Sequence, residues 1–301
     1  MKGDKPRSID SATLSMLEKA AQDGVTTAFE RSDQLKPCII GAEGTCCRIC
    51  VMGPCRVPKR KGLEEDDLRV GVCGATASII AARSFARMIA AGTAAHSDHG
   101  RGVAEALLYT ARGEMPGYRI TDEKKLYQVA LDFGVEIADR PVEEIAAEVA
   151  QLALHEFGKT EGHLIFTKRA PLRRQELWDR LGVRPRSIDR EVVETMHRST
   201  MGVDADYQNL MLQATRTALA DGWGGSMIAT ELQDILFGTP YPILGQVNLG
   251  VLDPKQVNVV VHGHEPLLSE IIVAVAWEPE IREQAERVGA EGINVVGICC
   301  T

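Results

Sequence analysis

The 301-residue sequence is long enough for a large core and more than one domain, and its composition, 45% hydrophobic and 25% charged, is that of an ordinary globular protein. The formal net charge of -8 argues against nucleic acid as the main partner, and no apolar run is long enough to span a membrane. The first ten residues lack the apolar core of a signal peptide. We therefore expect a protein of a reducing compartment, the cytoplasm.

The first three quarters of the chain carry mostly helical patterns. A helix is predicted to begin at a cap, Asp10 or Ser11, and to end at Gly24. An alanine-rich helix begins at Ala75, and Gly92 is expected to interrupt it. Further helical segments are predicted over residues 93–112, 122–133, 141–157, 172–181, 187–198 and 204–220.

The pattern changes after Gly238. Residues 257–261 form an apolar, β-branched run of the kind found in parallel sheets, and residues 293–298 form a second. Amphipathic stretches lie between them, so the order is strand, helix, strand. We predict an α then α/β fold with four parts: a helical cap (1–36), a cysteine-rich segment (37–74), a helical domain (75–237), and the beginning of a parallel-sheet domain (238–301).

Six of the eight cysteines lie in one short segment of the chain. They are Cys38, Cys46, Cys47, Cys50, Cys55 and Cys73. The run Cys47-x2-Cys50-x4-Cys55, followed by Cys73, supplies four thiolates at the tight loop spacing with which one chain wraps a [4Fe-4S] cube. Glycines and a proline between these cysteines suit a backbone that bends close to a cluster.

Cys38 and Cys46 are left over from this four-thiolate set. Adjacent side chains such as those of Cys46 and Cys47 project in different directions, so they serve two sites more easily than one. Two thiolates are half of a second cluster, and a twofold axis brings two such halves together. The segment therefore predicts one cluster within the subunit and one shared across a homodimer. Structural zinc and disulfides are the alternatives.

Two histidines follow the alanine-rich helix. His96 and His99 are three residues apart, so both lie on one face if the segment is helical. This geometry permits a proton relay, and the alternative is a pair of solvent-facing histidines.

Histidine and cysteine pairs also follow the two predicted strands. His262 and His264 come at the end of the first strand, and Cys299 and Cys300 at the end of the second. Because the carboxyl ends of parallel strands meet at one edge of a sheet, the pairs should lie close together. Mixed His and Cys ligation suits iron or nickel, whereas an inert buried cysteine and a core histidine are the simpler alternatives.

Several strings resemble the anaerobic nickel-iron carbon monoxide dehydrogenases. They are GTCCRICVMGPCR with GVCGA downstream, HSDH, MHRSTMGVDADYQNL, DILFGTP, NVVVHGHEP and GINVVGICCT. The resemblance extends from about Ser8 to the last residue. It implies a prismane-like fold, in which a helical domain bearing two iron-sulfur clusters precedes the start of a Rossmann-like domain.

The resemblance also implies a role for each candidate ligand. The four-thiolate set looks like the ligands of an intrasubunit [4Fe-4S] relay cluster. Cys38 and Cys46 look like one half of a cluster on the dimer axis, either [4Fe-4S] or [2Fe-2S]. His264 and Cys300 resemble ligands of the pendant iron in the nickel-iron-sulfur catalytic cluster.

His96 matches the family's active-site histidine beside the substrate, and His99 matches the next member of its proton path. A further histidine often follows one turn on, but Gly102 stands there in this sequence. The resemblance thus implies catalytic roles for His96 and His99 and leaves the outward proton route open.

The implied reaction is the reversible oxidation of CO by water to CO2, two protons and two electrons. The electrons would pass through the relay clusters to a ferredoxin-like acceptor, and an acetyl-CoA synthase subunit is a further candidate partner. In the family, the remaining ligands of the catalytic cluster and a catalytic lysine belong to a later region that this sequence does not contain. We expect this sequence to be the front part of a longer enzyme. Either the sequence is partial, the polypeptide is cleaved, or a companion chain supplies the remaining region.

Two other functions are alternatives. The first is a hybrid-cluster hydroxylamine reductase, although those proteins lack the CCxxC run and the HGHEP element found here. The second is a non-catalytic iron-sulfur chain for electron transfer or scaffolding, without a catalytic centre of its own.

Overall fold

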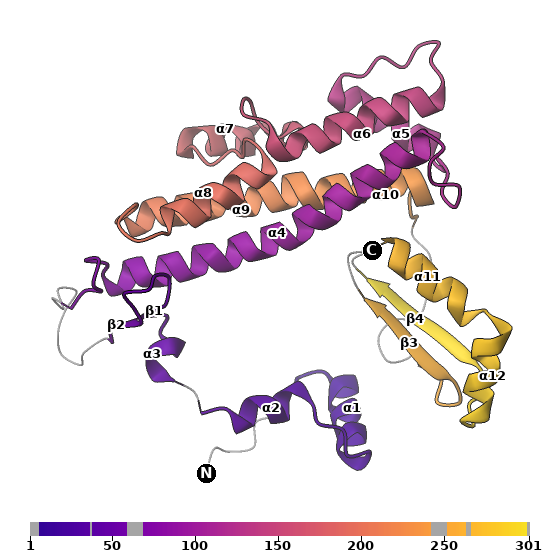
Figure 1. Ribbon diagram of the computed structural model, residues 1–301, viewed down its shortest axis with the longest axis horizontal. Coiled ribbons are helices and arrows are strands. Elements are labelled where there is room, and N and C mark those ends of the chain that lie inside the picture. The colour runs from indigo at the N-terminus through magenta and orange to yellow at the C-terminus, as the bar shows by residue number, and fades with distance from the viewer. Residues whose placement is uncertain (1–5, 37, 59–68, 242–251, 263–265, 300–301) are drawn as a thin grey trace. The chain divides into compact units, whose positions relative to one another are not determined.

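A computed structural model describes residues 6–36, 38–58, 69–241, 252–262 and 266–299 (Figure 1). Contacts divide the chain into two units, one formed by Ile39–Tyr241 and the other by Met1–Cys38 together with Pro242–Thr301. Within the described residues, no helix combines the length and the apolar character that crossing a membrane requires.

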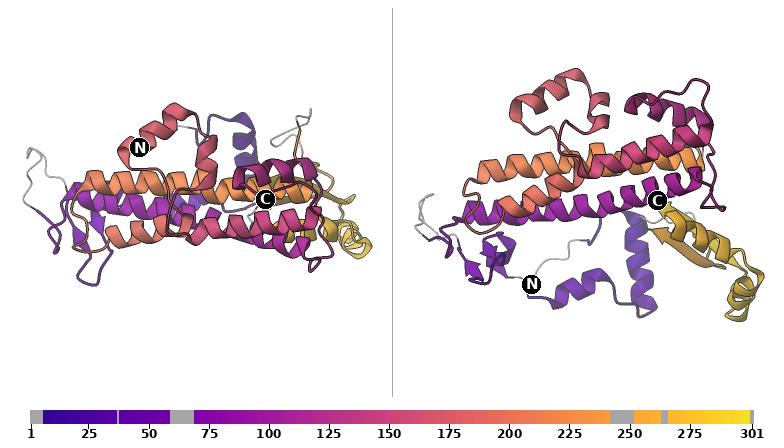
Figure 2. Two further views of the ribbon diagram at one scale, coloured as in Figure 1. Left: turned by 90° about the horizontal axis from the view of Figure 1, so that it is seen from above. Right: turned by 45° about the horizontal axis from the view of Figure 1, so that its top comes forward.

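The larger unit is a bundle built around one long helix, α4. Helices α6, α8, α9 and α10 pack against α4 along its length, and they run beside it in the views of Figures 1 and 2. The helical elements of this unit are α3 (Ile39–Ala42), α4 (Ala77–Ala111), α5 (Glu123–Phe133), α6 (Val142–Gly158), the 3-10 helix η1 (Ile165–Arg169), α7 (Leu172–Leu181), α8 (Ile188–Arg198), α9 (Tyr207–Ala220), the π-helix η2 (Asp221–Gly225) and α10 (Ser226–Phe237).

Helix α4 corrects one expectation from the sequence. It continues unbroken through Gly92, where an interruption was predicted. A glycine inside a helix costs only about 1 kcal/mol relative to alanine. The side chains that α4 buries on both sides of this position, among them Ile80 and Leu107, outweigh that cost. Local propensity is therefore overridden by packing.

The core of this unit lies where α4, α5, α6 and α10 meet. Its largest fully buried side chains include Leu107, Leu126, Ile145, Phe157 and Leu232. The helices predicted over residues 122–133, 141–157, 172–181 and 187–198 are confirmed within one or two residues of their ends, and that predicted over 204–220 begins three residues later, at Tyr207. Helix α10 and the π-helix η2 were not predicted, because glycines interrupt the apolar period there.

The second unit contains helices α1 (Ser11–Gln22) and α2 (Ala28–Gln34) in its first segment. The predicted cap is confirmed, since the Asp10 carboxylate accepts a hydrogen bond of 2.7 Å from the backbone N–H of Thr13. Helix α2, which the sequence reasoning missed, begins with a reciprocal capping box between Thr27 and Glu30.

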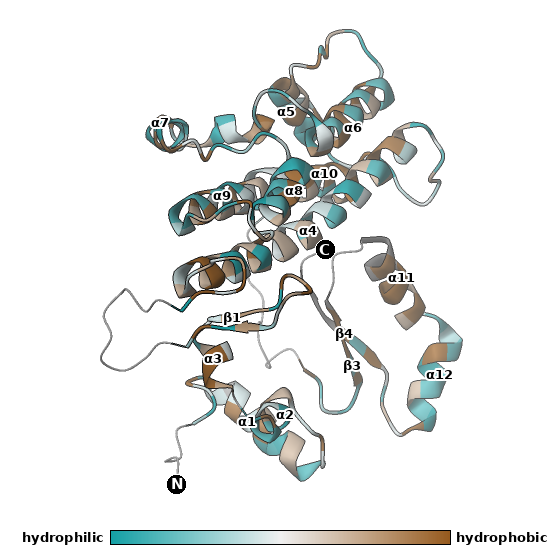
Figure 3. Cartoon of the chain, turned by 60° about the vertical axis from the view of Figure 1, so that its left-hand side comes forward, coloured by the Kyte–Doolittle hydropathy of each residue, from teal (hydrophilic) through white to brown (hydrophobic). Residues whose placement is uncertain are grey.

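The later segment of this unit has the predicted strand, helix, strand order. Strand β3 (Val257–His262) pairs in parallel with β4 (Ile293–Cys299), and α11 (Pro266–Ala276) packs on this two-stranded sheet. The hydropathy colouring of Figure 3 shows α11 as mainly apolar and the following α12 (Pro279–Arg287) as mainly polar. A parallel sheet is thus confirmed over the described residues.

Candidate metal centre

Three of the candidate cysteines are placed by a short hairpin. Strand β1 (Cys46–Cys47) pairs antiparallel with β2 (Cys55–Arg56), so that Cys47 lies opposite Cys55. In the connecting loop, the N–H of Gly53 donates to the carbonyl of Cys50 at 3.2 Å. A Cβ at Gly53 would lie 3.1 Å from the Cys47 carbonyl oxygen, so the loop is tight enough to favour glycine there.

Cys73 reaches the same place from a second loop. The N–H of Gly71 donates to the carbonyl of Ala75 at 2.8 Å, which folds this loop back on itself. A Cβ at Gly71 would lie 3.5 Å from the Cys55 Sγ atom, and the N–H of Val72 donates to that sulfur at 3.4 Å. The two loops are therefore joined by contacts to a thiol.

The four thiols of the predicted relay site line one pocket. It contains about 350 Å³ of space free of protein atoms, part of it open to solvent. Its lining comprises Cys47, Ile49, Cys50, Gly53, Cys55, Gly71, Val72, Cys73, Ala75, Ile80, Arg83 and Met201. The structure thus brings together the four cysteines that the spacing singled out, on the end of α4.

The donor set fits an iron-sulfur cluster. The six described cysteines from Cys38 to Cys73 are free thiols. Among the described residues, no three His, Cys, Asp or Glu side chains converge closely enough to hold a single metal ion. Thiols spread around a pocket, each facing a common space, suit a cube with several iron atoms, where every thiolate binds a different iron.

A buried arginine completes the pocket. The Arg83 side chain, on α4, is 2% exposed. Its Nη1 donates to the Cys73 Sγ at 3.5 Å, and its Nη2 donates to the backbone carbonyl of Asp204 at 2.8 Å. This hydrogen bond from Arg83 lowers the pKa of Cys73 below its ordinary value, which favours its thiolate form.

Cys46 and Cys38 are placed differently from the other four. Cys46 is half-buried and pairs with Arg56 in the hairpin, and successive side chains of a strand point to opposite faces. Cys38 is exposed and belongs to the other unit of the chain. Cys46 is outside the pocket lining, and its assignment to a second site stays a prediction.

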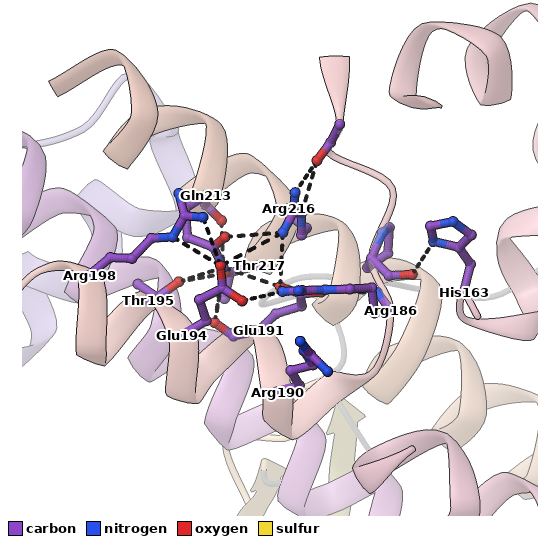
Figure 4. Close-up of polar contacts among 12 residues, drawn as sticks. His163, Arg186, Arg190, Glu191, Glu194, Thr195, Arg198, Gln213, Arg216 and Thr217 are labelled. Carbon is purple, nitrogen blue, oxygen red and sulfur yellow. Dashed lines mark hydrogen bonds and ion pairs between the residues drawn. The ribbon is translucent and has the colours of Figure 1, made fainter. Parts of the chain in front are cut away.

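A network of hydrogen bonds and ion pairs around the buried Glu191 links α8 to α9 (Figure 4). The fully buried Glu191 accepts hydrogen bonds from Arg186 at 2.8 and 2.9 Å and from Gln213 at 3.2 Å. Burial would raise the pKa of Glu194, but the hydrogen bond from Arg186 and the charges of Arg186, Arg198 and Arg216 together outweigh it and hold this pKa below its ordinary value.

The loop between α8 and α9 reaches the pocket from this network. Met201 lines the pocket, and the Asp204 carboxylate lies 3.8 Å from Arg198, which pairs with Glu194 at 2.9 Å. The Asp204 carbonyl is the acceptor for Arg83. This loop is therefore linked to α8 by an ion pair and to α4 by the hydrogen bond from Arg83.

His96 and His99 share α4, as predicted, but their surroundings differ. The His96 side chain is 42% exposed, whereas His99 is buried. The Asp221 carboxylate accepts a hydrogen bond from His96 Nδ1 at 2.8 Å, and the Ser226 hydroxyl donates to the same carboxylate at 2.7 Å. An ionised carboxylate only accepts, so Nδ1 of His96 is the donor in this hydrogen bond.

Backbone contact between α4 and η2 brings Asp221 to His96. A Cβ at Gly100 would lie 2.5 Å from the Gly225 carbonyl oxygen, and one at Gly225 would lie 2.9 Å from the Ser97 Cα. Only glycine at both positions permits this approach. The wider turn of a π-helix is a feature that recurs at functional sites.

The two strand ends meet in register. His262, the last residue of β3, lies directly opposite Cys299, the last residue of β4. The prediction that the two strands end at the same edge of the sheet is confirmed for the backbone of these two residues. The predicted iron ligands His264 and Cys300 lie outside the described residues.

Residues 45–301 match the Prismane/CO dehydrogenase family. The chain belongs to this family. Carbon monoxide dehydrogenase 1 of Methanosarcina acetivorans is 54% identical over 297 residues, which are 98% of this chain and 46% of that protein. This chain thus spans about half the length of that prismane/CO dehydrogenase family member.

Solved structures agree with this assignment. A nickel-free carbon monoxide dehydrogenase from Thermococcus sp. AM4 superposes with a TM-score of 0.85 at 45% identity, over 99% of this chain and 48% of that chain. A structure of acetyl-CoA synthase/carbon monoxide dehydrogenase with NiZn[Fe4S4] and NiNi[Fe4S4] clusters in its alpha subunits gives a TM-score of 0.84 at 44% identity, covering 98% and 43%. The described fold is therefore that of the prismane/CO dehydrogenase family.

Sequence reasoning missed two residues of these sites, Arg83 and Asp221. Each has a signal in the sequence. Arg83 interrupts an otherwise apolar alanine-rich stretch, where a charge needs a buried partner. Asp221 opens the string DGWGG, where clustered glycines between two helices indicate close backbone approach.

Proposed function

We propose that this chain belongs to an enzyme that oxidises CO with water, reversibly, to CO2, two protons and two electrons. The observation that carries the proposal is the pocket lined by Cys47, Cys50, Cys55 and Cys73 in a chain of the Prismane/CO dehydrogenase family. The relatives named above are carbon monoxide dehydrogenases, which favours CO oxidation over hydroxylamine reduction or a purely structural role.

The proposed cofactors follow from the thiols and from the relatives. Cys47, Cys50, Cys55 and Cys73 would hold a [4Fe-4S] relay cluster, and Cys38 and Cys46 would hold half of a [4Fe-4S] or [2Fe-2S] cluster shared with a second copy. His264 and Cys300 are proposed ligands of a nickel-iron-sulfur group. When bound, that group supplies the two-electron chemistry of carbon, and the thiolate-bound clusters supply one-electron transfer.

The proposed role of the histidines is to move protons. Asp221 holds His96 with Nδ1 protonated, at 2.8 Å, so that Nε2 accepts a proton released by the reaction. His99, one helical turn further along α4, is the proposed next carrier.

The relay cluster and the shared cluster would deliver electrons to a ferredoxin-like acceptor. A homodimer is proposed because Cys38 and Cys46 supply only half of a four-thiolate site. An acetyl-CoA synthase partner is proposed because one of the similar structures is an acetyl-CoA synthase/carbon monoxide dehydrogenase. A cytoplasmic location is proposed because clusters held by free thiolates need a reducing compartment.

The finer architecture is also proposed here. We propose that the parallel pair β3 and β4 with α11 is the start of a Rossmann-like domain. The division into 1–36, 37–74, 75–237 and 238–301 stays a prediction.

Metal analysis with a thiol variant tests the function. The protein is purified without oxygen, and iron, nickel and CO-dependent reduction of a viologen dye are measured. We expect Cys50→Ala to lose about four irons per chain and the dye reduction, because it removes one ligand of the relay cluster. Met52→Ala, an exposed neighbour in the same loop, is the matched control and should match wild type.

Each other outcome points to a different function. Iron without nickel, and no CO-dependent reduction in the wild-type protein, would support the electron-transfer or scaffold alternative. Reduction of hydroxylamine without oxidation of CO would support the hybrid-cluster alternative. An unchanged iron content in Cys50→Ala would contradict the relay cluster itself.

A further inference from the structure

Arg83 has features beyond its hydrogen bond to Cys73. It is almost fully buried, and it lines the same pocket as the four thiols. Its Nη1 and Nη2 have partners, the Cys73 sulfur and the Asp204 carbonyl, but its Nε has no hydrogen-bond partner among the described residues. A buried, unpaired donor of a guanidinium group is costly unless a further acceptor completes it.

The contacts of Arg83 hold it in place. The Asp204 carbonyl belongs to the loop between α8 and α9, and the Asp204 carboxylate lies 3.8 Å from Arg198, which pairs with Glu194 on α8 (Figure 4). No carboxylate is paired with Arg83 among the described residues, so its charge is not neutralised locally. The positive charge therefore acts on whatever group fills the thiol pocket.

An iron-sulfur cluster gains one negative charge when it is reduced. Hydrogen bonds to its sulfur atoms and nearby positive charge stabilise the reduced form and raise its reduction potential. Both effects are strongest where burial lowers the local dielectric constant, as it does around a side chain that is 2% exposed.

We propose that Arg83 is the positioning residue that sets the reduction potential of the relay cluster. It does so through its hydrogen bond to Cys73, through its unneutralised charge, and through the Nε donor left for the cluster. The proposal rests on the relay cluster of the proposed function. No electron is added or removed by Arg83 itself, which only shifts the balance between the oxidised and reduced cluster.

Potentiometric titration followed by electron paramagnetic resonance tests this in the holoenzyme. The relay signal is identified as the one that Cys50→Ala lacks. We expect Arg83→Gln to lower the reduction potential of the relay cluster by at least about 59 mV, for a one-electron couple. At a given potential, the ratio of reduced to oxidised cluster would then be at least about tenfold lower. Arg83→Lys keeps the charge but loses the planar fork of donors, so its shift should be smaller.

Arg87→Gln is the matched control. Arg87 lies one turn along α4 and bonds to the Ser199 hydroxyl at 2.9 Å and the Met196 carbonyl at 3.4 Å, but it does not line the pocket. We expect its relay potential to equal that of wild type. A shift in Arg83→Gln no larger than that in Arg87→Gln, or an upward shift, overturns the proposal.

A variant that fails to assemble the relay cluster also tests the proposal. If Arg83→Gln holds no relay cluster, the Arg83→Lys variant decides, because an unchanged potential there overturns the proposal and a lowered one supports it. If neither variant holds the cluster, Arg83 serves assembly and its role in setting the potential is overturned. A wild-type enzyme without any relay signal would instead overturn the cluster assignment of the proposed function.

Discussion

Gly100→Ala probes the backbone contact that places Asp221 against His96. Gly100 faces the π-helix η2, and the new Cβ would lie 2.5 Å from the Gly225 carbonyl oxygen. Carbon atoms of this kind do not approach an oxygen closer than 3.0 Å, so α4 and η2 must move apart by about 0.5 Å or more. The Gly225 carbonyl belongs to the backbone of a packed helix, so it cannot rotate away from the new methyl group.

The change in the free energy of unfolding follows from two opposing contributions. Gly→Ala inside a helix stabilises by about 1 kcal/mol through propensity alone. Overpacking of a close contact costs about 1–3 kcal/mol, so the clash outweighs the propensity gain in most of that range. Gly92→Ala in the same helix should be stabilised by the higher helix propensity of alanine without a clash, since nothing lies within 4 Å of its Cβ position.

The comparison of these two variants isolates the clash. For domains of 150–250 residues, 1 kcal/mol shifts the melting temperature by about 2–4 °C, so Gly100→Ala should melt about 2–12 °C below Gly92→Ala. Thermal unfolding of the anaerobically purified protein, followed by far-UV circular dichroism, measures this difference. If Gly100→Ala melts at or above Gly92→Ala, the backbone contact between α4 and η2 is not as described.

Three further predictions follow from charged and thiol groups. Asp221→Asn should slow CO-dependent dye reduction about 10–100-fold with unchanged metal content, because the amide no longer fixes the His96 tautomer. Glu231→Gln should lower the free energy of unfolding at pH 7 by about 1–3 kcal/mol, because it weakens the pair with Arg169 at 2.9 Å. Cys38→Ser should remove the spectroscopic signal of the shared cluster and spare that of the relay cluster.

The pH dependence of the second prediction has a definite sign. Burial would raise the pKa of Glu231, but hydrogen bonds from Arg169 and Lys125 outweigh it and hold this pKa below 4.5. A lowered pKa in the folded state gives stability that is present above pH 4.5 and is lost as the pH falls through the folded value. Denaturant midpoints measured between pH 7 and pH 3 should therefore fall less steeply for Glu231→Gln than for wild type.

Controls separate these effects from general damage. Glu283→Gln removes an exposed ion pair with Arg287 and should leave both stability and its pH profile unchanged. Ser226→Ala weakens the support of Asp221 without removing it, so its rate should lie between those of wild type and Asp221→Asn. A Cys38→Ser protein that keeps every cluster signal would contradict the assignment of Cys38 to a shared site.

The sequence determined which residues could form the relay site and the type of most elements. Ligand spacing is a local property, so Cys47, Cys50, Cys55 and Cys73 could be selected from the chain alone. The parallel pairing of β3 with β4 also follows from local pattern and the helical crossover between them. The role of the six cysteines as ligands stays a prediction.

Only the tertiary structure brought Arg83 to Cys73 and Asp221 to His96. Asp221 lies 125 positions from His96 in the chain, and no periodicity connects two segments so far apart. The continuity of α4 through Gly92 was decided in the same way, because packing on both sides outweighs the small cost of one glycine. Short-range spacing therefore predicts the candidate ligands, while the long-range packing of α4 against its neighbours decides which charges and hydrogen-bond donors surround them.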